Sequence, residues 1–192
     1  MDAMTDAPES DLDVARGLAE GTLPSPYAFG GNVFVCLRVS GVGVAWRAKA
    51  GEYAFRDPAL WTSPQLLSRC VGLPLLINHP EGEVLDGTEL ALRNCGVTIH
   101  SFIRDGEPWA IGRIIDADVG EALTHMPFDT SPSVTFEPDA NIRLALPDGD
   151  TLLIESSPRT LDHVALLPEG RGVWGEARGN EQGVEITEGQ QS

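Results

Sequence analysis

Histidine and serine side chains that stand at the ends of apolar segments have the types and positions suited to catalysis. His79 follows an apolar segment and precedes Pro80, which ends the regular backbone. His163 and Ser133 each begin another apolar segment. A serine hydroxyl becomes a good nucleophile when an imidazole takes its proton and a third group fixes the tautomer of that imidazole. Ser133 is therefore a candidate nucleophile, and His79 and His163 could supply the base and the orienting group, provided that the fold brings them together.

The other two histidines are weaker candidates for these roles. The chain has four histidines in all. His100 lies within an alternating strand pattern, and His125 lies at the end of a predicted helix, where a cation favours the helix dipole. Neither position favours catalysis.

The cysteines and the ligand spacing argue against a disulfide, a metal site or a bound cofactor. Cys36, Cys70 and Cys95 are odd in number, have no CxxC spacing and lie in apolar surroundings, which is typical of reduced, buried thiols. The site histidines show no paired metal-ligand spacing. The sequence also has no Gly-rich phosphate loop followed by a helix. We expect no cofactor and no metal ion.

The charge of the chain excludes one class of partner. Its 192 residues carry a formal net charge of −16, and a surface this acidic repels phosphate backbones, so we expect no nucleic-acid binding. Hydrophobic residues make up 42% of the chain, which is enough for a packed core. The sequence shows neither an export signal nor an apolar run long enough to cross a membrane.

The elements that must position these residues are mostly strands. Alternating and short apolar patterns predict a series of short strands and two short helices, which favours an α+β, mainly β fold with helices appended to a barrel or sandwich. Strands are predicted at 32–39, 42–47, 73–77, 96–104, 109–115, 133–136, 142–146, 151–155 and 163–167. The first two strands are predicted to form one hairpin, and 96–104 with 109–115 another.

Two helices and a loop complete the prediction. Ser63 followed by Pro64 marks the beginning of one helix. The second helix is predicted at 116–125, with acidic residues in its first turn. Residues 81–95 are predicted to be a loop. A tight turn is expected at 147–150.

The uneven charge predicts the domain organisation. Residues 1–29 are predicted to be an acidic, flexible N-terminal tail and linker, and residues 176–192 an acidic, flexible C-terminal tail. Residues 30–175 are predicted to form one domain.

The order of these segments resembles that of the prohead (capsid maturation) proteases of tailed phages. Asn78-His79-Pro80 ends an apolar strand, and a strand with Ser, Val and an aromatic residue follows about fifty residues later. The run from Asp162 to Gly172, which reads DHVALLPEGRG, is the most distinctive part. Over residues 30–175 the chain is similar to phage proteins encoded near capsid genes, which are similar to the prohead proteases and, more remotely, to herpesvirus assemblin.

This resemblance implies a fold, an activity and a setting. The fold would be an assemblin-like, partly open β-barrel with short peripheral helices. The activity would be that of a serine endopeptidase that cleaves scaffold and capsid proteins, and itself, inside the immature capsid in the host cytoplasm. Ser133 would be the nucleophile, His79 the base and His163 the orienting residue, with Asp162 as the alternative third member. Scaffold protein, major capsid protein and portal would be the partners, and self-association is compatible with this setting.

Departures from the family pattern leave alternatives open. Thr135 stands where the family has a glycine, which keeps Ser131 as a rival nucleophile. Arg159 or Arg171, with a backbone amide, is the kind of donor expected for an oxyanion. A different class of function is a catalytically inactive capsid-assembly or scaffold-associated protein with the same fold. A β-barrel of unrelated function is a third hypothesis.

Overall fold

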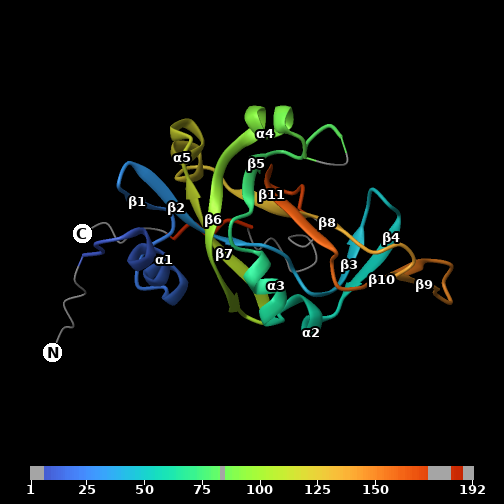
Figure 1. Cartoon of the computed structure of the whole chain (residues 1–192). Helices are drawn as coiled ribbons and strands as arrows, with labels where there is room; N and C mark the ends of the chain where they lie inside the picture. Colours follow the sequence, from blue (N-terminus) through green and yellow to red (C-terminus); the bar gives the residue numbers. More distant parts are fainter. Residues whose placement is uncertain (1–6, 83–84, 173–182, 188–192) are drawn as a thin grey trace.

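The protein is described by a computed structural model that covers residues 7–82, 85–172 and 183–187. In these residues the strands form two mixed sheets, with short helices around them (Figure 1). The prediction of an α+β, mainly β fold is confirmed. The strands outnumber those predicted, because several strands are short or only partly buried.

The larger sheet, sheet A, has seven strands in the order β1-β2-β7-β6-β5-β11-β8. Neighbouring strands are antiparallel except for β5 and β11, which are parallel. The strands are β1 (Tyr27–Phe29), β2 (Asn32–Arg38), β5 (Pro74–Ile77), β6 (Asn94–Arg104), β7 (Glu107–Ile114), β8 (Phe128–Thr135) and β11 (Thr160–Pro168). The predicted hairpin of β6 and β7 is confirmed.

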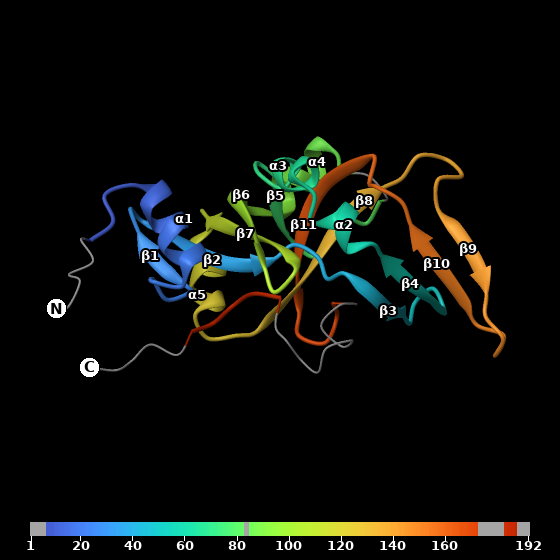
Figure 2. The same cartoon turned by 90° about the horizontal axis from the view of Figure 1, so that it is seen from below.

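The smaller sheet, sheet B, has four strands in the order β3-β4-β10-β9. They are β3 (Gly43–Arg47), β4 (Glu52–Arg56), β9 (Ile142–Ala145) and β10 (Thr151–Glu155). Strands β4 and β10 are parallel, and the other pairs are antiparallel. Figure 2 shows sheet B at one end of the molecule and α1 (Asp11–Glu20) at the other.

The main core lies against sheet A. Leu75 of β5, Val164 and Leu166 of β11 and Trp61 of α2 (Pro58–Trp61) are all buried in one cluster. Strands β5 and β11 lie inside the sheet with neighbours on both sides, which is why their segments are almost continuously apolar. Because the two strands are parallel, their carboxyl ends meet at one edge of the sheet.

Two of the remaining helices were predicted and one was not. Helix α3 (Pro64–Arg69) begins at the N-cap Ser63, and α5 (Ala117–Leu123) lies within the segment predicted as helix. The prediction of a loop over 81–95 was wrong in part, since α4 (Gly87–Arg93) lies there, capped by Asp86. None of its residues is buried, so it lacks the apolar periodicity that reveals a helix.

The prediction of a flexible tail and linker over 1–29 was wrong for the part that the structure describes. Helix α1 buries Val14 and Leu18 against β2 and β7, and its N-cap Ser10 accepts a hydrogen bond from the backbone of Asp13. Its acidic residues mask a narrow apolar face, so composition alone suggests a solvated tail.

The predicted C-terminal tail, residues 176–192, is described only over 183–187, and there it packs against the domain. Val184 is fully buried and forms a bridge with Leu37. The rest of that prediction lies outside the described residues.

The predicted hairpin of 32–39 with 42–47 was wrong. Strand β2 pairs with β7 in sheet A, whereas β3 pairs with β4 in sheet B. The Ser40-Gly41 connection therefore passes from one sheet to the other instead of forming a tight turn. Along the described strands, both sheets remain open and no pairing closes a barrel. No helix in the described ranges has the length and apolar character to span a membrane.

Candidate active site

The left-handed residue Asn78 sets the position of His79 at the end of β5. Asn78 has a φ of 61°, a conformation that asparagine tolerates better than most residues. Its backbone N–H donates to the carbonyl of Leu166 at 3.0 Å, which fixes the turn against β11. After this turn the His79 ring contacts Ser131 and His163, which lie within β8 and β11.

A β-bulge sets the positions of Asp162 and His163 on β11. The register of β11 with β8 shifts between Leu161 and His163, so that Asp162 is the extra residue. Neighbouring side chains on a regular strand point to opposite faces, whereas a bulge re-aims one of them. Here the Asp162 carboxylate reaches the adjacent ring, with its Oδ2 atom 2.9 Å from Nδ1 of His163.

Three contacts of equal length join four side chains. Ser131 Oγ lies 2.9 Å from Nε2 of His79, and His79 Nδ1 lies 2.9 Å from Nε2 of His163. The contact between His163 and Asp162 continues this chain. We call these four residues the Ser131 relay.

The direction of the hydrogen bonds follows from the carboxylate. An ionised Asp162 only accepts, so Nδ1 of His163 donates to it, and Nε2 of His163 must then accept from Nδ1 of His79 when both rings are neutral. His79 Nε2 is left as an acceptor for the Ser131 hydroxyl. This is the arrangement in which an imidazole can take a proton from a serine.

The surroundings of His79 change its pKa. His163 is almost fully buried and His79 is half-buried. Burial, the neighbouring His163 ring and the Lys49 ammonium hold the pKa of His79 below its ordinary value of 6.5. As the pH falls, His79 therefore stays neutral, and able to accept a proton, to a lower pH than an exposed histidine does.

The structure joins His79 to Ser131 and not to Ser133, the nucleophile expected first. Strand β8 begins at Phe128, well before Ser133, and the register places Ser131 opposite Ala165 and Ser133 opposite His163. Ala165 offers only a methyl group, which leaves room for the His79 ring. Within the described residues Ser133 makes no hydrogen bond with His79. The alternatives Ser131 and Asp162 are thus brought together with His79 and His163.

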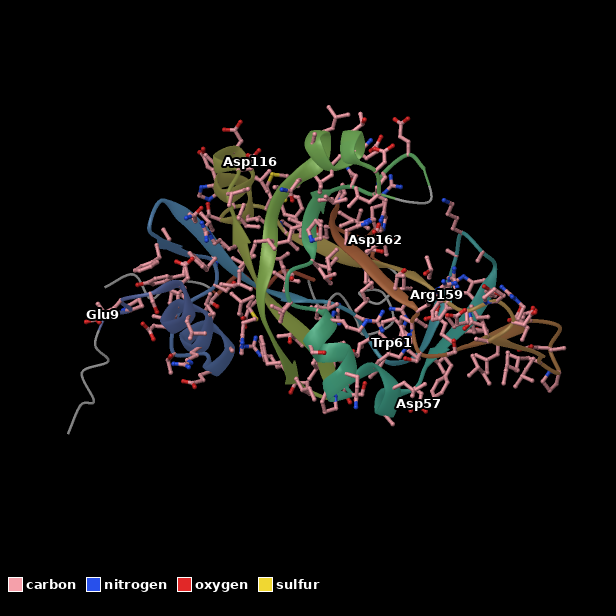
Figure 3. All side chains as sticks on the ribbon, in the orientation of Figure 1. Glu9, Asp57, Trp61, Asp116, Arg159 and Asp162 are labelled. Atoms are coloured by element: carbon pink, nitrogen blue, oxygen red, sulfur yellow. The ribbon has the colours of Figure 1, made fainter. Side chains whose placement is uncertain are left out.

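Residues that were considered for other roles lie in ordinary contacts. The Arg159 guanidinium forms an ion pair with Glu137 at 3.3 Å, and its backbone N–H donates to Thr135. The backbone N–H of Arg171 donates to Pro168. Both amides therefore already have acceptors. Figure 3 shows where the Arg159 and Asp162 side chains lie in the molecule.

The three cysteines are free and buried, as predicted. Burial raises the pKa of each thiol, that of Cys70 to about 11 and that of Cys95 to about 12. Such thiols stay protonated near neutral pH and are poor nucleophiles.

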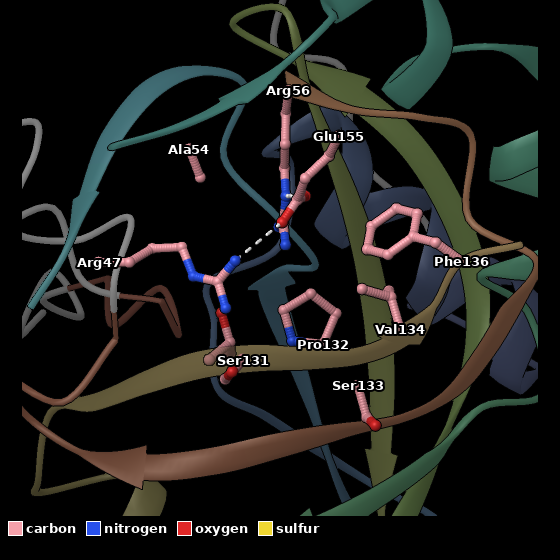
Figure 4. A pocket seen from close by; sticks show the side chains of 10 residues that line it. Arg47, Ala54, Arg56, Ser131, Pro132, Ser133, Val134, Phe136 and Glu155 are labelled. Atoms are coloured by element: carbon pink, nitrogen blue, oxygen red, sulfur yellow. Dashed lines mark hydrogen bonds and ion pairs between the residues drawn. The ribbon is translucent and has the colours of Figure 1, made fainter. Parts of the chain in front are cut away.

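A pocket beside Ser131 contains residues that sequence reasoning missed. Its volume is about 290 Å³, and it lies between β8 and the inner side of sheet B (Figure 4). Its charged lining residues are Arg47, Arg56 and Glu155. Their alternation along β3, β4 and β10 was visible in the sequence, but the usual expectation places charged residues on the solvent side of a sheet. We call this cavity the Arg47 pocket.

No protein-family model and no curated protein matches the chain. Among the residues that the structure describes, no group of three or more His, Cys, Asp or Glu side chains is arranged to hold a metal ion.

Proposed function

We propose that this chain is a serine endopeptidase in which Ser131 is the nucleophile and His79 the general base. One observation carries the proposal, namely the unbroken series of 2.9 Å contacts from Ser131 through His79 and His163 to Asp162. His163 orients His79, and Asp162 orients His163. Ser131 takes the role that the sequence first suggested for Ser133.

The first half of the reaction forms an acyl-enzyme. Ser131 Oγ attacks the carbonyl carbon of the scissile peptide bond while its proton moves to Nε2 of His79. The resulting imidazolium is stabilised because Nδ1–H of His79 points at His163. When the tetrahedral intermediate collapses, the C–N bond breaks and His79 returns the proton to the departing amine.

The second half restores the enzyme. A water molecule gives a proton to His79 and adds to the ester carbonyl, and the bond to Ser131 Oγ then breaks. His79 returns the proton to the serine, and the product leaves as a carboxylate. Asp162, which is 31% exposed, accepts the hydrogen bond of His163 at the far end of the relay.

The family resemblance extends this proposal to a biological role. We infer an assemblin-like, partly open β-barrel that matures phage capsids by cleaving scaffold and capsid proteins, and itself, inside the prohead in the host cytoplasm. Portal protein is a further partner in this proposal. The open edges of sheet A and the run from Asp162 to Gly172 support it.

The relay favours an enzyme over an inactive assembly protein. A purely structural protein gains little from two imidazoles lined up behind a serine hydroxyl, because each buried polar group must find a partner or lose free energy. Here every ring nitrogen has a partner, and the series ends at a hydroxyl that lines a pocket.

A fluorophosphonate probe tests the proposal on the full chain. It should label wild-type protein at Ser131, as located by peptide mapping, and intact-mass measurements should show the chain shortening itself with time. Ser131→Ala should abolish both. Ser101→Ala is the matched control, because its hydroxyl also lies on a strand and donates to Leu67 at 2.7 Å, away from the relay. A folded wild type that is neither labelled nor shortened would overturn the peptidase proposal.

A further inference from the structure

The Arg47 pocket carries a buried charge pair whose charges cancel. Arg56 Nε donates to Glu155 at 2.6 Å, and its Nη1 donates to Ser40 at 2.6 Å. The guanidinium also lies 4.0 Å from the centre of the Trp61 ring. This pair is a fixed part of the pocket wall.

Arg47 adds a cation that is not matched in this way. Its guanidinium lies 3.5 Å from Glu52 and 3.6 Å from Glu155, which is longer than a normal charged hydrogen bond. Within the described residues it makes no hydrogen bond, and its side chain is 37% exposed. Figure 4 shows it directed into the pocket above Ser131. Its planar set of N–H donors therefore faces the cavity.

The pocket lining carries one more cation than anion, and Glu52, outside the lining, lies 3.5 Å from Arg47. Two guanidiniums and one carboxylate line it, whereas the whole chain carries −16. A second cation, Lys49, lies close enough to act on the charge of His79. A lysine or arginine entering here would meet cations, while a carboxylate would meet the donors of Arg47.

We propose that the Arg47 pocket is a subsite for an Asp or Glu side chain of the substrate peptide, and that Arg47 recognises its carboxylate. This inference rests on the proposed peptidase function. A volume of about 290 Å³ suits a single side chain. Ser131 lines the same cavity, so the acidic residue lies next to the bond that is cleaved.

Two activity-based probes of equal shape test the subsite. Diphenyl phosphonates that carry a Glu or a Gln side chain react when Ser131 Oγ displaces phenoxide, which leaves as phenol after His79 passes on the serine proton. We expect wild-type protein to react about tenfold faster with the Glu probe, because hydrogen bonds to charged groups are the stronger ones. Arg47→Gln should remove this preference, as followed by intact mass.

The control and the generic probe separate two failures. Arg143→Gln makes the same change on the same sheet, at a residue outside the pocket lining, and should keep the preference for the Glu probe. Fluorophosphonate labelling with equal rates for the Glu and Gln probes would overturn the subsite and leave the peptidase intact. Absence of labelling by any probe would overturn both.

A second observation, independent of the site, concerns the other face of sheet B. The pairing registers align two complete rows of apolar side chains across its four strands. One row is Val44, Phe55, Ile154 and Ile142, and the other is Trp46, Tyr53, Leu152 and Leu144. We call these eight residues the outer face of sheet B.

Sheet B has its charged side chains on the inner side and its apolar side chains on the outer face, which is the reverse of the usual arrangement. The inner side carries Arg47, Glu52, Arg56 and Glu155, whereas the outer face carries no charge. Ile142 is 55% and Leu144 45% exposed. A continuous apolar face of this size on a soluble chain usually marks a contact surface.

We infer that the outer face of sheet B binds the same face of a second copy of this chain. The net charge of −16 makes two copies repel each other over most of their surface, and this face lets them meet without bringing carboxylates together. Two identical twisted sheets also pack face to face, as in a β-sandwich, with a two-fold axis between them.

The size of the face sets the strength of this dimer. Four strands about 4.8 Å apart and about five residues long, at about 3.3 Å each, give a footprint on the order of 300 Å². A standard stable interface buries about 800 Å² on each partner. We therefore expect a dimer that dissociates on dilution and that salt strengthens, because salt screens the acidic repulsion.

Sedimentation velocity on the full chain tests this inference. Wild-type protein should pass from monomer to dimer between about 1 and 200 µM, the range expected for a small interface. Leu144→Glu should remain monomeric. Leu92→Glu is the matched control, because Leu92 is 74% exposed but lies on α4. A wild type that stays monomeric throughout, or a Leu144→Glu variant that still dimerises, would overturn the inference.

Discussion

Two groups of buried polar side chains border Ser131, and they are built in opposite ways. The Ser131 relay, from sheet A and the turn after β5, consists of a hydroxyl and two imidazoles with a single charge at its far end. The pair of Arg56 and Glu155, from sheet B, consists of two full charges in direct contact. One group is suited to moving a proton, and the other to holding a fixed charge.

The difference lies in what each group loses when one member is removed. A neutral imidazole that loses a partner leaves one unpaired hydrogen-bonding group, whereas a buried guanidinium that loses its carboxylate leaves an uncompensated charge. Burial acts to lower the pKa of Arg56, and Glu155 opposes that shift. We therefore expect changes in the relay to alter chemistry and changes in the ion pair to alter stability.

His79→Ala should give the largest change. Without the base, the rate at which the fluorophosphonate probe labels Ser131 should fall by about 10³-fold or more. The free energy of unfolding, measured with urea, should fall by only about 1–2 kcal/mol, since His79 is half-buried and its loss leaves Nε2 of His163 without its partner. His125→Ala, an exposed histidine at the end of α5, is the control and should leave both quantities unchanged. A collapse of stability would break the contrast between the two groups.

Arg56→Met should show the opposite pattern. It removes the 2.6 Å partner of the buried Glu155 and leaves only Arg47, at 3.6 Å, so the free energy of unfolding should fall by about 3 kcal/mol. Labelling of the folded fraction at Ser131 should stay within about threefold of wild type. Arg159→Met is the control, because the Arg159–Glu137 pair is largely exposed and contributes about 1 kcal/mol or less. Equal losses from the two variants would show that the Arg56 pair is not special.

The pH dependence should reflect the lowered pKa of His79. The labelling rate requires the neutral imidazole, so it should be flat above pH 6.5 and should fall only at a pH below that value. Stability follows the same sign. The unfolded chain binds the proton more readily, so His79 lowers the free energy of unfolding as pH falls below 6.5. A fall in rate centred above pH 6.5 would contradict the environment described for His79.

The sequence predicted the mainly β fold and the two histidines of the relay for the same reason. Apolar strands buried on both sides give strong local signals, and His79 and His163 stand where such strands end or begin. The amphipathic helix α1 and the exposed helix α4 give weak signals, because one has a narrow apolar face and the other buries nothing.

Other features of the site depend on register, which local patterns do not contain. The bulge at Asp162 inserts one residue into β11 and turns the carboxylate towards His163. Sequence spacing treats Asp162 and His163 as pointing to opposite faces. Arg47 was missed for a related reason. An alternating strand has two faces, and the local sequence does not show which face lies inside.

The smallest effect is expected from Ser133→Ala, and it is also the sharpest test of the register. Ser131 and Ser133 lie on the same face of β8, two residues apart, and differ in what stands opposite them on β11. If Ala165 leaves the space that admits His79 to Ser131, then Ser133→Ala should change the labelling rate by less than about threefold, whereas Ser131→Ala abolishes labelling.

Peptide mapping of the labelled wild type identifies the serine that reacts. Label on Ser133 would mean that β8 shifts by two residues along β11 in the active enzyme. A shift of two residues keeps every side chain on its own face of the sheet, so the core would tolerate it. The position of the label would then be the measurement that reveals the shift.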